Sequence, residues 1–390
     1  MKRGFKITGL IIGSLLVLII AAGLVIPVIF KDRIRDKVEN QINSMVNSRV
    51  AFSGYKLSLF RAFPNVAFTL KDLTVTGIDI FEGDTLAAVK SFSLVFNLMS
   101  LFGDGGYEIK SVTVNDLLVN AIVREDGVAN WDIMKETPDQ VEDTTAIKQP
   151  SSMQVALNKF IISDGRVYYT DRQSGMTASI GDLDFNLSGN MAGSETELDF
   201  DLTAGNTDFE MNRIPWLTNA TIGFRAGIDA MLDSMKFTLR DNVFKINDIA
   251  LSFSGTAAMP DDDIDLDMIF SAPETSFKSL LSLIPAFYMK GYEDLNASGT
   301  MTLDGVIKGI YSSADSTLPD VALNLKVSDG LISYPALPEK ITDINIAGTV
   351  QTDGRDMDKT VAEVSSFHFM LAGNPFDMNL TMATPISDPA

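Results

Sequence analysis

The sequence predicts a mainly β protein in which one membrane-spanning helix and one short amphipathic helix precede antiparallel sheet. Three observations support this fold class: a long uncharged apolar run near the N-terminus, a helical period directly after it, and a period of two over most of the remaining chain. With 390 residues, the chain is long enough for more than one compact core, or for a single extended β architecture.

The apolar run covers residues 7–30 and contains no charged side chain. As a helix it would extend for about 36 Å, more than the roughly 30 Å of a bilayer's hydrocarbon core. Lys2, Arg3 and Lys6 lie in the short head before it (residues 1–6), which favours a cytoplasmic N-terminus. Basic residues also follow the run, so a charge count alone does not fix the orientation. The run is longer than the core of a cleaved signal peptide, and Ile20 would occupy a position unfavourable for cleavage. We therefore expect an uncleaved membrane anchor.

Residues 31–47 change to a helical period. Ile34, Val38 and Ile42 recur every four residues and share one face of a helix, while Asp36 and Lys37 lie on the other. This pattern predicts an amphipathic helix. We expect it to cap the first strands of the following domain; the alternative is a helix that lies on the membrane surface.

Beyond residue 50, apolar and polar residues alternate, which predicts strands with one apolar and one solvated face. The clearest candidates for an apolar lining are Phe92, Leu94 and Phe96, then Leu183, Phe185 and Leu187, and then Leu198 and Phe200. No alternation of strands with helices occurs, so a parallel α/β sheet is not expected. The period alone fits two arrangements equally well: an open apolar groove, or a sandwich in which two such faces close on each other.

A short motif recurs along the chain: an apolar residue, any residue, Asp, Leu or Ile, any residue and another apolar residue. Copies begin at Leu70, Val114, Ile180, Ile246 and Ile341. Because the alternation slips by one residue at the Asp, each copy predicts a β-bulge or a short Asx turn. A second motif, Ser163-Asp164-Gly165 and Ser328-Asp329-Gly330, predicts a turn that enters a strand. We interpret the recurrence as repetition of similar strand groups.

Two segments interrupt the strand pattern. Residues 138–150 are polar, acidic and without period, which predicts a linker or loop between a first β region (residues 48–137) and a second one (residues 151–390). Residues 274–289 have helical spacing that ends or kinks at Pro285. We expect this helix to pack on the sheet rather than to act as a mobile lid.

Composition excludes several kinds of chemistry. The chain has no cysteine and a single histidine, His368, so it has no disulfide, no thiol nucleophile and no His-rich metal site. The net charge of −20 argues against a nucleic-acid partner. The acidic run 261–267 lacks the glycine and the distal glutamate of a calcium loop, so we interpret it as a solvated strand face. We interpret Trp131 and Trp216 as packing anchors, and we expect neither an enzyme nor a bound metal or cofactor.

An ordered set of features runs through residues 1–135. After the basic head and the two predicted helices come residues 55–64 (YKLSLFRAFP), residues 70–73 (LKDL) and residues 127–133 (GVANWDI). The last element, with Asn130, Trp131 and Asp132, is the most specific. In this order and spacing, the chain resembles the N-terminal region of the AsmA family of bacterial envelope proteins, which is related to TamB. Residues 151–390 look like the continuing strand repeats of such proteins.

The resemblance implies a location and an activity. It implies a single-pass anchor in the bacterial inner membrane, a cytoplasmic N-terminus and a periplasmic β domain linked to outer-membrane assembly. It also favours the groove over the sandwich: an elongated, twisted antiparallel sheet with an apolar lining, similar to the chorein-type bridge proteins that pass phospholipid between membranes. Phospholipid is then the expected partner; the alternative is a scaffold that binds outer-membrane proteins or assembly factors through exposed strand edges. Members usually exceed 390 residues, so we expect a truncated sequence or a short paralogue.

Overall fold

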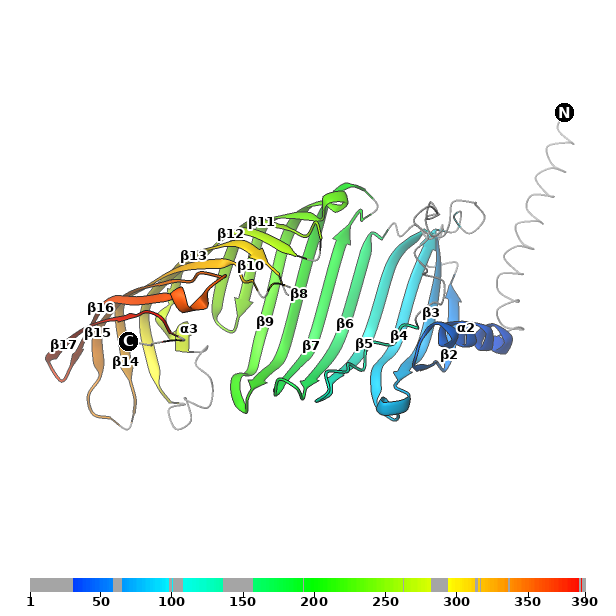
Figure 1. Cartoon of the computed structure of the whole chain (residues 1–390), viewed down its shortest axis with the longest axis horizontal. Helices are drawn as coiled ribbons and strands as arrows, with labels where there is room; N and C mark the ends of the chain where they lie inside the picture. Colours follow the sequence, from blue (N-terminus) through cyan, green and yellow to red (C-terminus); the bar gives the residue numbers. More distant parts are fainter. Residues whose placement is uncertain are drawn as a thin grey trace, which may run out of the picture. The chain divides into compact units, whose positions relative to one another are not determined.

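The structure, a computed structural model, describes most of the chain after residue 30. The described residues are 31–58, 65–97, 100, 108–135, 157–191, 193–261, 263–281, 294–312, 315, 317–335, 337–385 and 387. They form two compact units, Met1–Leu157 and Asn158–Ala390, and both are built mainly from antiparallel strands (Figure 1). The predicted mainly β class is thus confirmed.

Several predictions concern residues outside this description. The predicted cytoplasmic head, the membrane anchor at 7–30 and the linker at 138–150 all lie outside the described residues. Within the part that is described, no helix has the length and apolar character needed to cross a membrane.

The first unit begins with helix α2 (Lys31–Met45), which covers all but the last two residues of the expected amphipathic helix. The strands that follow are β1 (Arg49–Ala51), β2 (Gly54–Ser58), β3 (Asn65–Thr76), β4 (Thr85–Asn97) and β5 (Ile109–Val123), with the short 3-10 helix η1 (Asp79–Phe81) before β4. Strand β3 pairs with β1, β2 and β4, and β4 pairs with β5, all antiparallel. Helix α2 contacts β1 and β2. The Asn43 side chain fastens it there by two hydrogen bonds to the backbone of Val50, of 2.7 and 2.8 Å.

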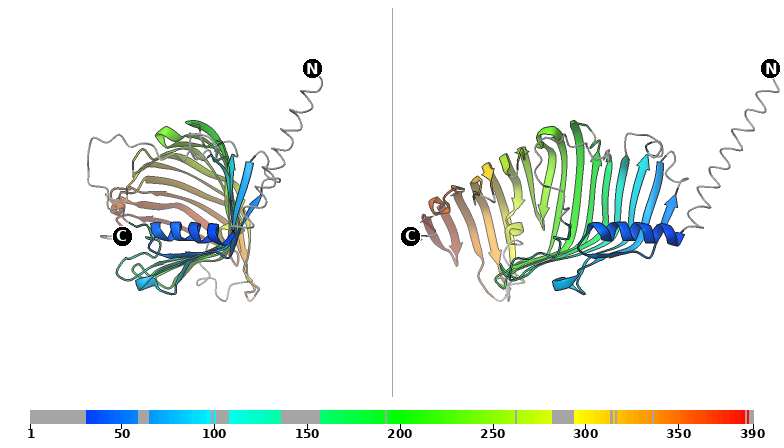
Figure 2. Two further views of the ribbon diagram at one scale, coloured as in Figure 1. Left: turned by 90° about the vertical axis from the view of Figure 1, so that its right-hand side faces the viewer. Right: turned by 45° about the vertical axis from the view of Figure 1, so that its right-hand side comes forward.

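The second unit is an antiparallel meander in which each strand pairs with its neighbour in the chain. Its strands are β6 (Lys159–Asp171), β7 (Met176–Gly189), β8 (Glu195–Met211), β9 (Ile214–Met231), β10 (Lys236–Ile246), β11 (Ile249–Ala258), β12 (Ile264–Ser276), β13 (Asn296–Tyr311), β14 (Asp320–Ser333), β15 (Ile341–Gln351), β16 (Val361–Leu371) and β17 (Asn374–Met382). Short helices are α3 (Phe277–Leu281), η3 (Leu232–Ser234) and η4 (Met357–Lys359). Figure 2 shows that the sheet of this unit is twisted and curved rather than flat.

The recurring Asp motif forms β-bulges in two of its copies, because the strand register shifts beside Asp182 and Asp343 but not beside Asp72 or Asp116. Asp72, Asp116, Asp182 and Asp343 all have a positive φ, between 46° and 53°, inside a continuous strand. Asp tolerates this left-handed conformation better than most residues because its short side chain hydrogen-bonds locally. The copy that begins at Ile246 differs, because there Asn247 takes the positive φ in the turn between β10 and β11.

The second motif was expected to form turns, and this expectation is wrong. Asp164 and Asp329 also have a positive φ, of 54° and 52°, but they lie inside β6 and β14. The register of each strand against its neighbour shifts beside them. Ser-Asp-Gly is therefore a second bulge sequence. In the second copy, packing explains the glycine: a Cβ atom added to Gly330 would lie 2.8 Å from the Cβ of Ile344 on the next strand.

Bulges in neighbouring strands lie at the same level of the sheet. We call Asp164, Asp182, Asn206 and Asn219 on β6 to β9, with Asp329 and Asp343 on β14 and β15, the bulge row. A bulge leaves a backbone N–H group without its partner in the strand ladder. In three of these bulges, a side-chain oxygen of the adjacent strand accepts the hydrogen bond from that N–H group. Asp164 donates to Asp184 Oδ1 at 3.2 Å, Asn219 to Asp208 Oδ1 at 2.9 Å, and Asp329 to Asn345 Oδ1 at 3.3 Å. Because each bulge bends and twists its strand, the row curves the sheet along one line.

Helix α3 begins three residues later than the helix expected at residues 274–289. Residues 274–276 belong to β12, and the helix begins at Phe277. Pro273 has no N–H to donate, and the ladder between β12 and β13 shifts register between Ala272 and Thr275. The part of the expected helix after Leu281 lies outside the described residues.

Candidate functional site

A line of phenylalanine rings crosses one face of the second unit. Successive ring centroids are 5.6, 5.0, 5.2, 6.3, 6.3 and 6.1 Å apart, one ring on each strand from β6 to β12. We call these rings the Phe row: Phe160, Phe185, Phe200, Phe224, Phe244, Phe253 and Phe270. Most neighbouring rings are tilted or edge-on, the arrangements that aromatic pairs prefer.

Strand register brings these rings together. Phe200 lies opposite Leu187 on β7 and opposite Ala226 on β9, so its nearest rings, Phe185 and Phe224, are diagonal neighbours on the same face. Diagonal positions in an antiparallel sheet remain within reach of aromatic side chains. The smaller Ala226, which is 2% exposed, leaves room between the rings of β8 and β10.

The Phe row is only partly shielded from solvent. Its rings are half-buried, except for Phe270, which is 7% exposed. Among the elements that the structure describes, the main contacts of β6 to β9 are with their own neighbours in the sheet. A sandwich would place a second sheet over these rings and bury them. The face is therefore open in the described structure.

The candidate lining residues from the sequence all lie on apolar strand faces. Leu183 and Leu198 are 9% and 6% exposed, whereas Phe185, Leu187 and Phe200 are half-buried. In the first unit, the half-buried residues Phe92, Leu94 and Phe96 lie on β4 opposite Leu70, Phe68 and Val66 of β3. Sequence alternation thus placed each residue on the correct kind of face within its own unit. It missed the Phe row as a set, because the rings align only once the register of each strand is known.

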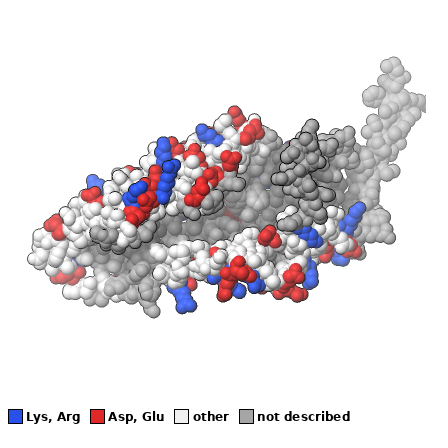
Figure 3. Space-filling model, viewed as in Figure 1, with Lys and Arg blue, Asp and Glu red and all other residues white. Residues whose placement is uncertain are grey.

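The opposite face of the second unit is charged. Arg225 pairs with Asp201 at 3.0 Å and Lys308 with Asp267 at 2.8 Å. The hydrogen bond and charge of Asp267 raise the pKa of Lys308. These pairs are exposed and add little stability, but they keep this face solvated. Figure 3 shows clusters of acidic and of basic side chains on the surface of the molecule. Within the described residues no group of carboxylates is arranged to hold a metal ion.

Asn130 of the family motif closes the end of a strand. It is 4% exposed, its Oδ1 accepts the N–H of Ile122 at 2.9 Å, and its Nδ2 donates to the carbonyl of Asn120 at 2.8 Å. The chain then returns to α2, where Lys135 Nζ donates to the carbonyl of Asn43 at 3.0 Å.

The other motif residues have exposed positions. Trp131 is 44% exposed and Asp132 is also exposed. Trp216, on β9, is 44% exposed as well. The interpretation of the two tryptophans as packing anchors is therefore wrong. In the first unit, the buried anchor of the motif is Asn130.

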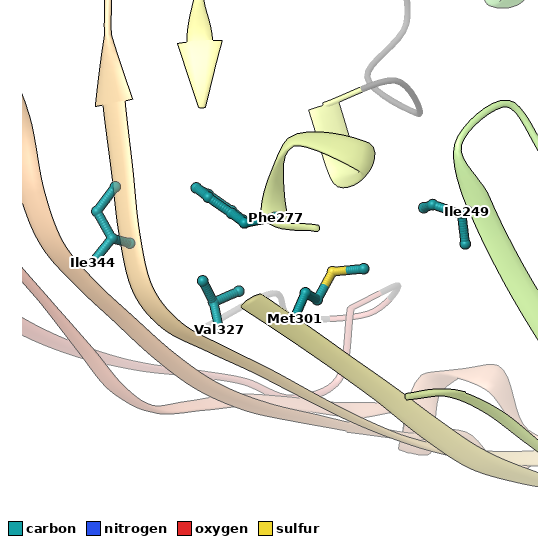
Figure 4. Close-up of a cluster of buried hydrophobic side chains, with 5 residues drawn as sticks. All are labelled: Ile249, Phe277, Met301, Val327 and Ile344. Atoms are coloured by element: carbon teal, nitrogen blue, oxygen red, sulfur yellow. The ribbon is translucent and has the colours of Figure 1, made fainter. Parts of the chain in front are cut away.

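Helix α3 covers a different part of the apolar face of the second unit. Phe277 of α3 packs against Ile249, Met301, Val327 and Ile344, and all five side chains are 5% exposed or less (Figure 4). Three of them, Ile249, Met301 and Val327, are the largest fully buried side chains among the described residues. The apolar face thus has an open part, along the Phe row, and a closed part beneath α3.

Comparison with known proteins gives one match. A family model described as the AsmA family matches residues 1–222, a range that includes the whole first unit and the strands β6, β7 and β8. No curated protein and no solved structure matches the chain.

Proposed function

Because this chain belongs to the AsmA family, we propose that it is a non-enzymatic, membrane-anchored envelope protein that holds phospholipid by its acyl chains and passes it along the Phe row. The observation that carries the proposal is the half-buried state of these rings. An acyl chain laid on them would leave water, with a gain of about 0.8 kcal/mol for each buried CH₂ group.

The dimensions of the Phe row suit an acyl chain. With neighbouring strands about 4.8 Å apart, the row spans roughly 29 Å. The hydrocarbon of one bilayer leaflet is about 15 Å thick, half of the roughly 30 Å core. The row therefore exceeds the length of one leaflet. Since each ring contacts the next, a sliding chain would exchange one aromatic contact for another of the same kind.

We place the protein at the bacterial inner membrane. Residues 7–30 would form the anchor with a cytoplasmic N-terminus, and the two β units would lie in the periplasm and act in outer-membrane assembly. A reporter enzyme that is active only in the cytoplasm, fused at residue 150, should then be silent. Activity of that fusion would reverse the proposed orientation.

The test of lipid binding compares two charge insertions on one strand. Phe200→Asp puts a carboxylate into the Phe row, whereas Thr203→Asp puts the same group on the exposed opposite face of β8. The full chain is purified and its lipids are extracted and quantified by mass spectrometry. We expect phospholipid with the unmodified chain and with Thr203→Asp, and a clear loss with Phe200→Asp. Absence of phospholipid from the unmodified chain would refute the proposal.

One observation favours a second candidate, a scaffold that binds extended protein strands. Every residue of β17 is exposed, and its apolar residues Phe376, Met378 and Leu380 are 46%, 51% and 56% exposed. Exposed edge strands pair readily with another chain. Co-purification of an outer-membrane protein without phospholipid would favour this function over the first.

A further inference from the structure

The Phe row crosses a gap in the backbone ladder between β10 and β11. The two strands pair on both sides of the gap, but their register shifts between Leu239 and Phe244. Residues 240–243 of β10 therefore face residues 252–254 of β11 without forming a ladder pair across this edge. Phe253, one ring of the row, lies in the middle of the gap.

The side chain of Asn242 bridges the gap. Its Oδ1 accepts the N–H of Phe253 at 2.6 Å, and its Nδ2 donates to the carbonyl of Phe253. The amide thus makes the same two bonds to Phe253 that a residue of a neighbouring strand makes in an antiparallel ladder. Asn242 is 6% exposed, so without it the two backbone groups of Phe253 would lose their partners at a buried position. On its other edge, Phe253 lies opposite Phe270 in an unbroken ladder with β12.

Phe253 is the link between two segments of the Phe row. Five rings lie on β6 to β10, from Phe160 to Phe244, and Phe253 and Phe270 lie beyond the gap. With strands about 4.8 Å apart, the longer segment spans roughly 19 Å and the shorter one roughly 5 Å. The hydrocarbon of one bilayer leaflet is about 15 Å thick. The longer segment alone could therefore hold an acyl chain, whereas the shorter one needs Phe253 in line with Phe244, whose ring centroid is 6.3 Å away.

We propose that Asn242 is a positioning residue of the Phe row, which holds Phe253 where an acyl chain can extend from the rings of β6 to β10 onto β11 and β12. This inference rests on the proposed function, because it needs an acyl chain on the row. An amide suits this role because it carries both the donor and the acceptor that the backbone of Phe253 requires. Without that amide, the N–H and the carbonyl of Phe253 would have to turn toward water, and the ring would leave its place between Phe244 and Phe270.

A benzophenone amino acid can report lipid on each side of the gap. At Phe200 it lies in the longer segment. At Met268 it lies beyond the gap, because Met268 is half-buried on β12 and two-residue alternation puts it on the face of Phe270. Each full-length variant is reconstituted in vesicles of phosphatidylethanolamine and phosphatidylglycerol, and the yield of phospholipid crosslinks is measured with Asn242 present and with Asn242→Ala. We expect the ratio of the yield at 268 to the yield at 200 to fall by about tenfold in Asn242→Ala, the effect of leaving about two CH₂ groups in water.

Two further variants separate this role from a general loss of structure. Asn130→Ala is the matched control, because Asn130 is also a buried amide that bonds a backbone N–H and a backbone carbonyl, but in the first unit. It should leave the ratio unchanged. Asn242→Asp adds a pH readout: an ionised carboxylate can accept the N–H of Phe253 but cannot donate to its carbonyl, whereas the protonated acid does both. Because burial favours the protonated form, the ratio in Asn242→Asp should be low at about pH 8 and recover at about pH 5, and Asn242→Ala should show no such recovery.

The other outcomes distinguish this inference from the proposed function. Phospholipid crosslinks at both positions with an unchanged ratio in Asn242→Ala would refute the role of Asn242 and leave the proposed function standing. An equal fall of the ratio in Asn130→Ala, or a loss of crosslinks at both positions in Asn242→Ala, would show a general effect on the fold and overturn the inference. If the unmodified chain gives no phospholipid crosslink at either position, the proposed function fails and this inference fails with it.

Discussion

Replacing Phe200 by aspartate tests whether the Phe row is an open surface or part of a sealed core. A fully buried Phe replaced by a small residue costs about 3–5 kcal/mol. Phe200 is half-buried and contacts two rings at 5.0 and 5.2 Å. We therefore expect a loss of about 2 kcal/mol in the free energy of unfolding of the second unit. The new carboxylate adds no large penalty because water reaches it on an open face.

Met301→Asp is the matched control for a sealed position. Met301 is 1% exposed beneath α3, so the variant loses a buried side chain and also buries a charge with no partner. Together these should cost more than about 5 kcal/mol, which approaches the whole stability of many domains, about 5–15 kcal/mol. We expect Phe200→Asp to fold and Met301→Asp to unfold.

The assay uses the two tryptophans of the chain. Trp131 belongs to the first unit and Trp216 to the second. In a Trp131→Phe background, the fluorescence of Trp216 during urea denaturation reports the second unit. If Phe200→Asp unfolds that unit as fully as Met301→Asp does, the row is part of a closed core and the reasoning is refuted.

Three further substitutions test the supporting structure. Asn130→Ala should lower the free energy of unfolding of the first unit by roughly 2–4 kcal/mol, since it leaves two backbone groups without their hydrogen-bond partner. Urea denaturation, followed by Trp131 fluorescence in a Trp216→Phe background, measures this loss, and an unchanged denaturation midpoint would contradict the prediction. Gly330→Ala should destabilise the second unit by about 1–3 kcal/mol, because the new Cβ would lie 2.8 Å from that of Ile344; Gly223→Ala, whose nearest contact is 3.8 Å away, should change the urea midpoint little. Hydrogen bonds from Lys110 and Asn97 lower the pKa of Glu108 from its ordinary 4.5. The ionised Glu108 side chain thus stabilises the first unit above pH 4.5, and this contribution is lost as the pH falls through the lowered pKa. Glu108→Gln should flatten this part of the stability–pH profile. An unchanged profile would count against the role of Glu108 in it.

Local sequence patterns predicted much of the strand structure. Alternation placed Phe92, Leu94 and Phe96 on one face of β4, because a side-chain period of two follows directly from the pleat. The slip in alternation predicted bulges correctly at Asp182 and Asp343, where the strand register shifts. At Asp72 and Asp116 the backbone has a positive φ but the register does not shift, so no bulge forms there.

Longer-range features were beyond these patterns. The Ser-Asp-Gly motif was interpreted as a turn because turns also favour Asp followed by Gly. The packing of Gly330 against Ile344 involves another strand, so the motif itself gives no sign of it. The Phe row depends on the register of successive strands, which each bulge shifts, so Phe224 and Phe244 gave no separate signal in the sequence. The start of α3 was predicted three residues too early because Pro273 and the register shift beside it keep residues 274–276 in β12.

The central claim, that phospholipid acyl chains lie on the Phe row, can be tested most directly by photo-crosslinking in cells. A benzophenone amino acid is placed at Phe200 in one variant and at its neighbour Asp199, which is exposed on the opposite face of β8, in another. The two positions are adjacent in the chain and differ mainly in the face on which they lie. We predict crosslinks to phospholipid from position 200 and none from position 199. Equal crosslinking from both positions, or crosslinks from position 200 to protein alone, would contradict the claim.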